Sequence, residues 1–242
     1  MYKKSMRVAV AAMGVALLLS SCGGGNKLPD YDYQIDMEKY EDSITVTDSS
    51  YLTLVNKQNP CGEGYAPKSI SVVASELTLY GKEVKLESTA ALAAEALIKE
   101  LHARGYTDIV ITSGYRDYAY QQILFNTYLG NEMAEHPDWT QAQCEAEVLT
   151  YSAKPGESEH QTGLCVDLIS TDHPSLDVAF ADNPAYAWLM ENAHAFGFIL
   201  RYPEGAEGTT GYSYEPWHYR FVGVKAATEI HERGITLEEY LS

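Results

Sequence analysis

The sequence predicts an α+β protein in which a single domain holds a small antiparallel sheet flanked by helices. Apolar residues recur at helical spacing in several segments, while other apolar runs are short and typical of strands. These helices and strands do not follow the strict alternation that a parallel sheet requires. With 242 residues, 45% of them hydrophobic and 21% charged, the chain has the length and composition of one large globular domain.

Apolar periodicity, capping residues and glycine stops together predict five helices. Asp138 is the expected N-cap of the third, and Asn183 followed by Pro184 is a typical start for the fourth. Glycine ends the first, fourth and fifth. The expected helices are 90–104, 117–129, 139–151, 183–197 and 224–233, and the expected strands are 109–111, 163–169, 198–201 and 217–222.

The N-terminal segment is typical of an export signal. Basic residues precede an apolar run at 8–19, which is shorter than the roughly 20 residues that span a bilayer as a helix. The run ends in Leu-Ser-Ser-Cys, which resembles the lipobox of bacterial lipoproteins, although a plain signal peptide with a chance cysteine is the alternative. We expect a signal peptide at 1–21, a lipidated Cys22 with a flexible acidic tether at 22–50, and the folded domain at 51–242.

Charge and cysteine content limit the partners and the covalent structure. The chain has 17 Lys and Arg against 34 Asp and Glu, a net charge of −17, which disfavours nucleic acid as a partner. Beyond Cys22, three cysteines remain, and in an oxidising compartment they allow at most one bridge. The pairing among Cys61, Cys144 and Cys165 stays open.

Three stretches carry the residues of a metallohydrolase. They are Ser-Glu-His-Gln-Thr-Gly-Leu-Cys-Val-Asp at 158–167, Glu-Pro-Trp-His-Tyr-Arg at 215–220 and Ser-Gly-Tyr-Arg-Asp at 113–117. Together they supply two histidines, one aspartate and a nearby glutamate. This is the inventory of a catalytic zinc site, with three protein ligands, an open fourth position and a carboxylate base.

The local context of each residue agrees with this interpretation. Asp167 lies in an apolar strand, where a carboxylate needs a partner such as a cation, although it could instead cap the following loop. Glu215 and His218 are three residues apart, so His218 can bind the metal while Glu215 faces the attacking water. Trp217 between them can form a wall of the cleft. Arg116 follows a strand and a glycine turn and can reach a pocket; a surface ion pair with Asp117 or Asp108 is the alternative.

These motifs, in this order, resemble the VanY-type zinc D-alanyl-D-alanine carboxypeptidases. The family pattern Ser-x-His-x-x-Gly-x-x-x-Asp is complete here, as are Glu-x-Trp-His and the upstream Ser-x-Tyr-Arg element. The segment Leu-Val-Asn-Lys-Gln-Asn-Pro at 54–60 also matches the start of the family domain. The resemblance covers roughly residues 51–235 and implies the zinc D,D-peptidase fold, which hedgehog domains share.

The resemblance also implies roles for individual residues around one catalytic zinc ion. His160, Asp167 and His218 are the implied ligands, Glu215 the general base and Arg116 the electrophilic clamp. Gln121 and Ser158 match positions that line the substrate site. Two departures, at Cys165 and Cys61, are interpreted as packing changes, with the Cys165 thiol buried and inert.

The expected function is therefore removal of the terminal D-Ala from peptidoglycan stem peptides by a monomeric lipoprotein that faces the cell envelope and meets the membrane only through its lipid. An L,D-carboxypeptidase or a D,D-dipeptidase would use the same metal site. From a different class, an inactive cell-wall binding module remains possible, but it should lack the base or a ligand, and all four residues are present. A serine enzyme is disfavoured because no serine has a lysine three residues later.

Overall fold

A four-stranded antiparallel sheet lies at the centre of the protein, whose computed structural model describes residues 27–242. Its order is β3 (Ile109–Ser113), β4 (Cys165–Ser170), β6 (His218–Phe221) and β5 (Phe198–Leu200). All six residues of β4 are buried, as expected for a central strand with both faces covered. Two further strands, β1 (Ile70–Val72) and β2 (Lys85–Glu87), form a separate antiparallel pair. The predicted α+β class with a small antiparallel sheet is confirmed.

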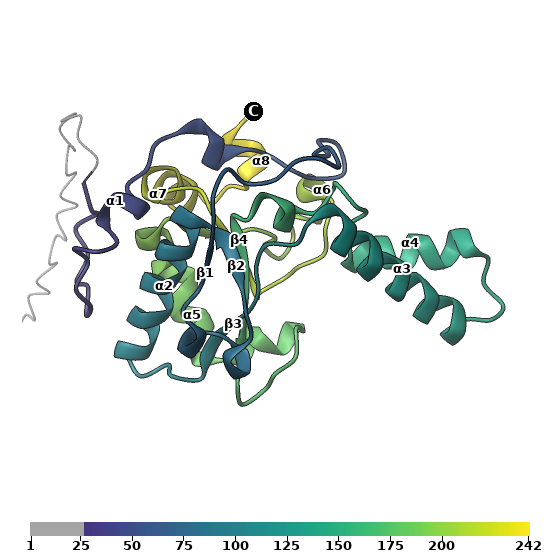
Figure 1. The fold of residues 1–242 in the computed structure, drawn as a ribbon, viewed down its shortest axis with the longest axis horizontal. Coiled ribbons are helices and arrows are strands. Elements are labelled where there is room, and N and C mark those ends of the chain that lie inside the picture. Colours follow the sequence, from purple (N-terminus) through teal and green to yellow (C-terminus); the bar gives the residue numbers. More distant parts are fainter. Residues whose placement is uncertain (1–26) are drawn as a thin grey trace, which may run out of the picture.

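Helices surround this sheet unevenly. The helices α2 (Ser88–Ala103) and α5 (Pro184–Asn192) contribute buried apolar residues to the core that they share with the sheet. The pair α3 (Tyr118–Glu135) and α4 (Gln141–Tyr151) packs together and projects away from the body of the molecule (Figure 1). The remaining α-helices are α1 (Glu41–Ile44), α6 (Glu207–Thr210), α7 (Val224–Arg233) and α8 (Leu237–Tyr240), and short 3-10 turns lie at 49–52, 75–77, 79–81, 159–162, 178–182 and 193–196. Within residues 27–242, no helix is both long and apolar enough to cross a bilayer.

Three helix boundaries differ from the prediction. The helix expected at 117–129 continues to Glu135. Thr140, not Asp138, caps α4, because its side chain and that of Gln143 form a reciprocal capping box. The helix predicted at 183–197 is also divided: α5 ends at Asn192, and a tighter 3-10 turn leads to Gly197, which adopts a left-handed φ of 81°.

The predicted flexible tether at 22–50 is wrong for much of its length. Met37, Tyr40 and Ile44 belong to the main hydrophobic core, with Ile44 fully buried. The hydroxyl of Tyr33 donates a hydrogen bond of 3.0 Å to the carbonyl of Ala195. The polar composition of this segment conceals a few apolar residues that pack on α2. The signal peptide at 1–21 and Cys22 lie outside the described residues.

Candidate metal centre and catalytic cleft

The two central strands bring Asp167 and His218 together. Asp167 on β4 is the register partner of His218 on β6, so their side chains project from the same face of the sheet. His218 Nδ1 lies 3.1 Å from Asp167 Oδ1. A pair so far apart in sequence is thus fixed by strand pairing.

His160 reaches the same place from the 3-10 turn that precedes β4. Gly163 ends this turn in a left-handed conformation, with φ of 68°, and a Cβ there would lie only 2.8 Å from the backbone nitrogen of Glu87. The Nδ1–H of His160 donates a 2.6 Å hydrogen bond to the carbonyl of Gly114. Because Nδ1 is the donor, Nε2 is free to bind a metal, and it lies 3.3 Å from Asp167 Oδ2.

The chemistry of this buried cluster fits a zinc ion. Two imidazoles converge on one carboxylate, and this set of nitrogen and oxygen donors is typical of zinc. His218 presents its Nδ1 to this carboxylate, while its Nε2 faces Glu159 on the other side of the ring. Burial and Arg116 lower the pKa of His160, but Cys165 and Asp167 more than reverse this and raise it to about 9. The cluster therefore attracts positive charge, as a cation site must.

Glu215 lies at the edge of this cluster, on the turn before β6. Its Oε2 is 3.6 Å from His218 Nδ1, and the backbone N–H of Glu215 donates to the carbonyl of Tyr202. Burial raises the pKa of Glu215 to about 7. A carboxylate with this pKa can accept and return a proton near neutral pH, which is what a general base requires.

A cleft of about 320 Å³ opens over the cluster and is lined by the other predicted residues of the active site, namely Arg116, Gln121, Ser158 and Trp217. The Nε of Arg116 and the Oε1 of Gln121 are buried without partners among the described residues. The Nε2 of Gln121 donates to the carbonyl of Ala153, which fixes the orientation of its amide. The structure thus brings the predicted residues of the active site together around one cleft.

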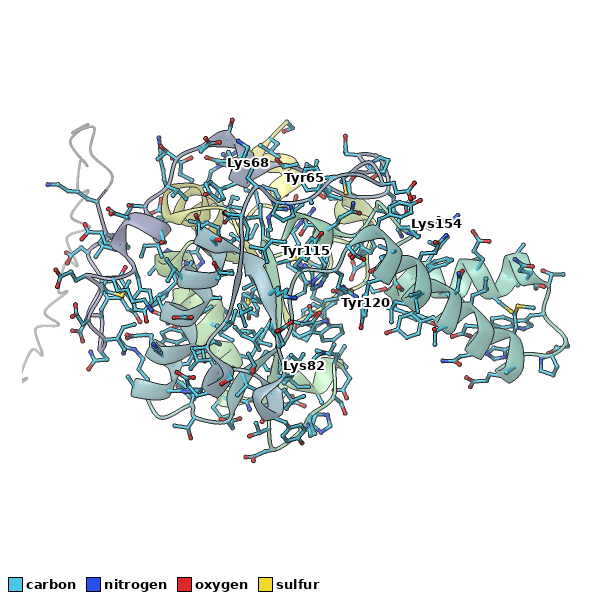
Figure 2. The ribbon with its side chains drawn as sticks, viewed as in Figure 1. Tyr65, Lys68, Lys82, Tyr115, Tyr120 and Lys154 are labelled. Carbon is cyan, nitrogen blue, oxygen red and sulfur yellow. The ribbon has the colours of Figure 1, made fainter. Side chains whose placement is uncertain are left out.

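The alternative role for Arg116, a surface ion pair, has no support in the described part of the chain. Asp117 instead caps α3 by accepting a hydrogen bond from the backbone of Tyr120, and Asp108 accepts one from Ser170. Arg116 also lines a second hollow, together with Lys82, Tyr115 and Tyr120, whose side chains are labelled in Figure 2. Arg116 therefore borders both hollows.

Sequence reasoning missed a buried ionic network behind the metal cluster. Glu159 Oε1 accepts hydrogen bonds of 2.8 Å from both Arg201 and Arg220, and all three side chains are fully buried. Burial alone would raise the pKa of Glu159, but the two guanidinium groups hold it well below its usual range. Glu159 Oε2 faces His218 Nε2 at 3.7 Å. The network thus supports the second histidine from behind.

Tyrosines form much of the cleft wall, and the motifs did not identify them. Tyr128 and Tyr151 come from the projecting α3–α4 pair, while Tyr202 and Tyr212 come from loops around β5 and α6. The composition held a signal for this, because the chain has 19 tyrosines and only five phenylalanines.

Cys165 is fully buried, as predicted. One donor atom from each of His160, Cys165 and His218 lies within 4.8 Å of the other two, and all three residues are buried. Burial raises the pKa of the Cys165 thiol, but the two histidines outweigh it and lower the pKa to about 7. Cys61, Cys144 and Cys165 are all free thiols, so no bridge forms among them.

With this geometry in place, comparison with known proteins identifies the class. The family model described as VanY, D-alanyl-D-alanine carboxypeptidase, matches residues 83–224, and the chain belongs to this family of hydrolases. The predicted family and the predicted carboxypeptidase activity are thereby confirmed.

Particular relatives agree with this assignment. A D-alanyl-D-alanine carboxypeptidase of Enterococcus faecalis (strain ATCC 700802 / V583) is 40% identical over 191 residues, which cover 79% of this chain and 65% of that protein. The solved LdcB LD-carboxypeptidase has a TM-score of 0.68 and 36% identity, covering 79% of this chain and 85% of its own. A vancomycin resistance D,D-pentapeptidase VanY, solved in complex with Zn(II), has a TM-score of 0.66 and 36% identity, covering 80% and 99%. That zinc complex agrees with the predicted cofactor.

Proposed function

We propose that His160, Asp167 and His218 hold a catalytic zinc ion and that Glu215 is the general base of a D,D-carboxypeptidase. The observation that carries this proposal is the buried Asp167 carboxylate, which lies 3.1 Å from His218 Nδ1 and 3.3 Å from His160 Nε2. When bound, zinc supplies a Lewis acid that polarises the peptide carbonyl and makes water a stronger acid.

The side chains of the cleft have separate roles in the reaction. Glu215 takes a proton from the attacking water as the new C–O bond forms, and passes it to the departing amine when the C–N bond breaks. Arg116 stabilises the negative charge that develops on the carbonyl oxygen. The free Oε1 of Gln121 accepts a hydrogen bond from a substrate amide, while Ser158 and Trp217 line the binding site. No covalent intermediate is required.

The proposed substrate is a peptidoglycan stem peptide that ends in D-Ala-D-Ala. The E. faecalis relative and the VanY structure support this choice. The likeness to LdcB favours a second candidate, an L,D-carboxypeptidase that shortens a tetrapeptide stem. Both reactions would use the same metal and base, so the choice depends on the subsites of the cleft.

Mass spectrometry of muropeptides after incubation with the full chain distinguishes these functions. Conversion of pentapeptide to tetrapeptide stems with loss of D-Ala is expected, and it should stop with a chelator and return with added zinc. The Glu215→Gln variant should retain zinc and lose at least about 10²-fold in turnover. Cleavage of tetrapeptide stems alone would select the L,D activity, and unchanged stems with zinc-loaded protein would contradict catalysis.

We further propose that the protein is exported as a monomeric lipoprotein attached through Cys22, which places the domain beside its substrate. The basic and apolar pattern of residues 1–21 supports this. Cys22→Ala should abolish lipid labelling and release the protein from the membrane fraction. The Cys61→Ala variant is the matched control and should behave as the wild type. Membrane retention of both variants would contradict anchoring through Cys22.

A further inference from the structure

His218 presents its two ring nitrogens to two different carboxylates. Its Nδ1 lies 3.1 Å from Asp167 Oδ1, within the cluster that is proposed to hold the metal. Its Nε2, on the other side of the ring, faces Glu159 Oε2 at 3.7 Å. Because a neutral imidazole carries one proton, the nitrogen that binds a metal must be the one without it. The group beside Nε2 therefore affects whether Nδ1 is available as a ligand.

The two atoms that face each other lack other partners in the described part of the chain. Within residues 27–242, His218 Nε2 and Glu159 Oε2 are both buried without a hydrogen bond. Their separation of 3.7 Å is too long for a hydrogen bond, but an approach of about 1 Å would bring them to the distance of a charge-assisted one. A buried polar atom without a partner is costly. Pairing these two atoms with each other removes both costs.

The carboxylate of Glu159 is held in an orientation that directs Oε2 at His218. Its Oε1 accepts hydrogen bonds of 2.8 Å from both Arg201 and Arg220. Other donors of Arg220 bind backbone carbonyls, and other donors of Arg201 bind Glu238. The carboxylate cannot rotate without breaking bonds to two buried guanidinium groups, which is costly. Oε2 therefore stays beside the imidazole.

We propose that Glu159 is a positioning residue, which accepts a hydrogen bond from the Nε2–H of His218 and so keeps Nδ1 of this ring free for the metal. The inference rests on the proposed function, since it concerns the same metal. His160 is oriented in the corresponding way, because its Nδ1–H donates to the carbonyl of Gly114 and leaves Nε2 free. The two histidines thus bind through opposite nitrogens, each fixed by a hydrogen bond on the far side of its ring.

Zinc affinity of the full chain, measured with a competing chelator, tests this role without any measurement of activity. In Glu159→Gln the amide must turn its oxygen to the two arginines, so its NH₂ group opposes the Nε2–H of His218. Zinc binding should weaken by at least about tenfold. Glu238→Gln is the matched control, because it removes a carboxylate that binds Arg201 in the same network, and it should retain the wild-type affinity. Equal zinc affinities in the two variants would overturn the proposal.

Nitrogen-15 NMR of the histidine rings gives a second readout, which needs only the wild type and so does not depend on the folding of a variant. In the zinc-loaded protein, the His218 proton should lie on Nε2, shifted downfield and protected from exchange by Glu159. Glu238→Gln should keep this signal. A zinc-loaded wild type whose His218 lacks a protected Nε2 proton would overturn the role of Glu159 and leave the zinc peptidase proposal intact. A wild type that binds no zinc would overturn both proposals.

Discussion

At the scale of single residues, the cleft holds two buried carboxylates whose surroundings shift their pKa values in opposite directions. Burial alone would raise the pKa of Asp167, but His160 and His218 hold it well below its usual range. Burial raises the pKa of Glu215 to about 7, and its distance to the nearest imidazole nitrogen is 3.6 Å. One carboxylate is thus held in the ionised form and suited to bind a cation, while the other can exchange a proton near neutral pH.

The raised pKa of Glu215 should reduce stability, because the unfolded chain releases this proton at a lower pH than the folded protein. Between pH 4.5 and about 7 the contribution of Glu215 to the stability of the wild type therefore falls as pH rises. Glutamine cannot ionise, so metal-free Glu215→Gln should be more stable than the wild type at pH 7.5 by up to about 3.5 kcal/mol, at about 1.4 kcal/mol per pH unit.

Urea unfolding of the metal-free proteins at several pH values measures this difference. The advantage of the variant should be small at pH 4.5 and grow toward pH 7.5. The substitution Glu63→Gln, at an exposed position, is the control and should give no such trend. A constant difference across the pH range would show that the gain does not come from the ionisation of Glu215.

Arg116 can be assigned by the kinetic constant that it changes. Its Nε is buried and unpaired among the described residues, and its backbone N–H donates to the carbonyl of His160. If the guanidinium acts on the developing oxyanion, Arg116→Lys keeps the charge, loses the planar fork and should lower kcat more than about tenfold, with a smaller change in KM.

Steady-state kinetics on an acyl-D-Ala-D-Ala peptide, with metal content measured in parallel, decide the role. A change confined to KM would assign Arg116 to the terminal carboxylate of the substrate instead. If Arg116→Lys keeps the kcat and KM of the wild type, Arg116 has no role in catalysis or substrate binding. Loss of a surface ion pair would give that result, since such pairs contribute only about 0–1 kcal/mol.

At the scale of elements, the turn before β4 controls the position of His160. Gly163 and Gly234 both adopt left-handed conformations at helix ends, with φ of 68° and 60°. A Cβ at Gly163 would collide with the Glu87 backbone at 2.8 Å, whereas a Cβ at Gly234 would meet nothing within 4 Å. Gly163→Ala should therefore cost more than the roughly 1 kcal/mol expected for φ alone, and it should also weaken zinc binding.

The Gly234→Ala variant provides the matched comparison for this cost. It should lose only the conformational contribution, about 1 kcal/mol in urea unfolding, and keep full zinc affinity. Equal losses of stability in the two variants, with equal zinc affinity, would show that contact with β2 does not constrain the turn.

The same elements show what sequence patterns can and cannot predict. Strand 163–169 was predicted close to β4, because an apolar run between turn residues is a local signal. The Thr140–Gln143 capping box is equally local and could have replaced Asp138 as the expected cap. The Glu159 network could not be predicted, since Arg201 and Arg220 reach it from 42 and 61 residues away. Only the packing of β5 and β6 brings these charges together.

At the scale of the whole molecule, residues 27–50 belong to the fold. The hydroxyl of Tyr40 accepts a hydrogen bond from Lys99 on α2, and the backbone of Gln34 donates to the buried carboxylate of Glu100. If Cys22 carries a lipid, the free length between membrane and domain is shorter than a tether ending at residue 50 would allow. The orientation of the cleft toward its substrate then depends in part on this packing.

Ile44 tests whether this segment contributes to the stability of the domain. Its side chain is fully buried at the end of α1, which packs on α2. Replacement with alanine removes buried apolar volume, so Ile44→Ala should lower the free energy of unfolding by about 2–4 kcal/mol. Ile70→Ala removes the same atoms from a side chain that is 40% exposed, and should cost less than about 1 kcal/mol. Urea unfolding of the two variants measures both losses of free energy of unfolding. Equal small losses would show that residues 27–50 act as a tether and do not stabilise the domain.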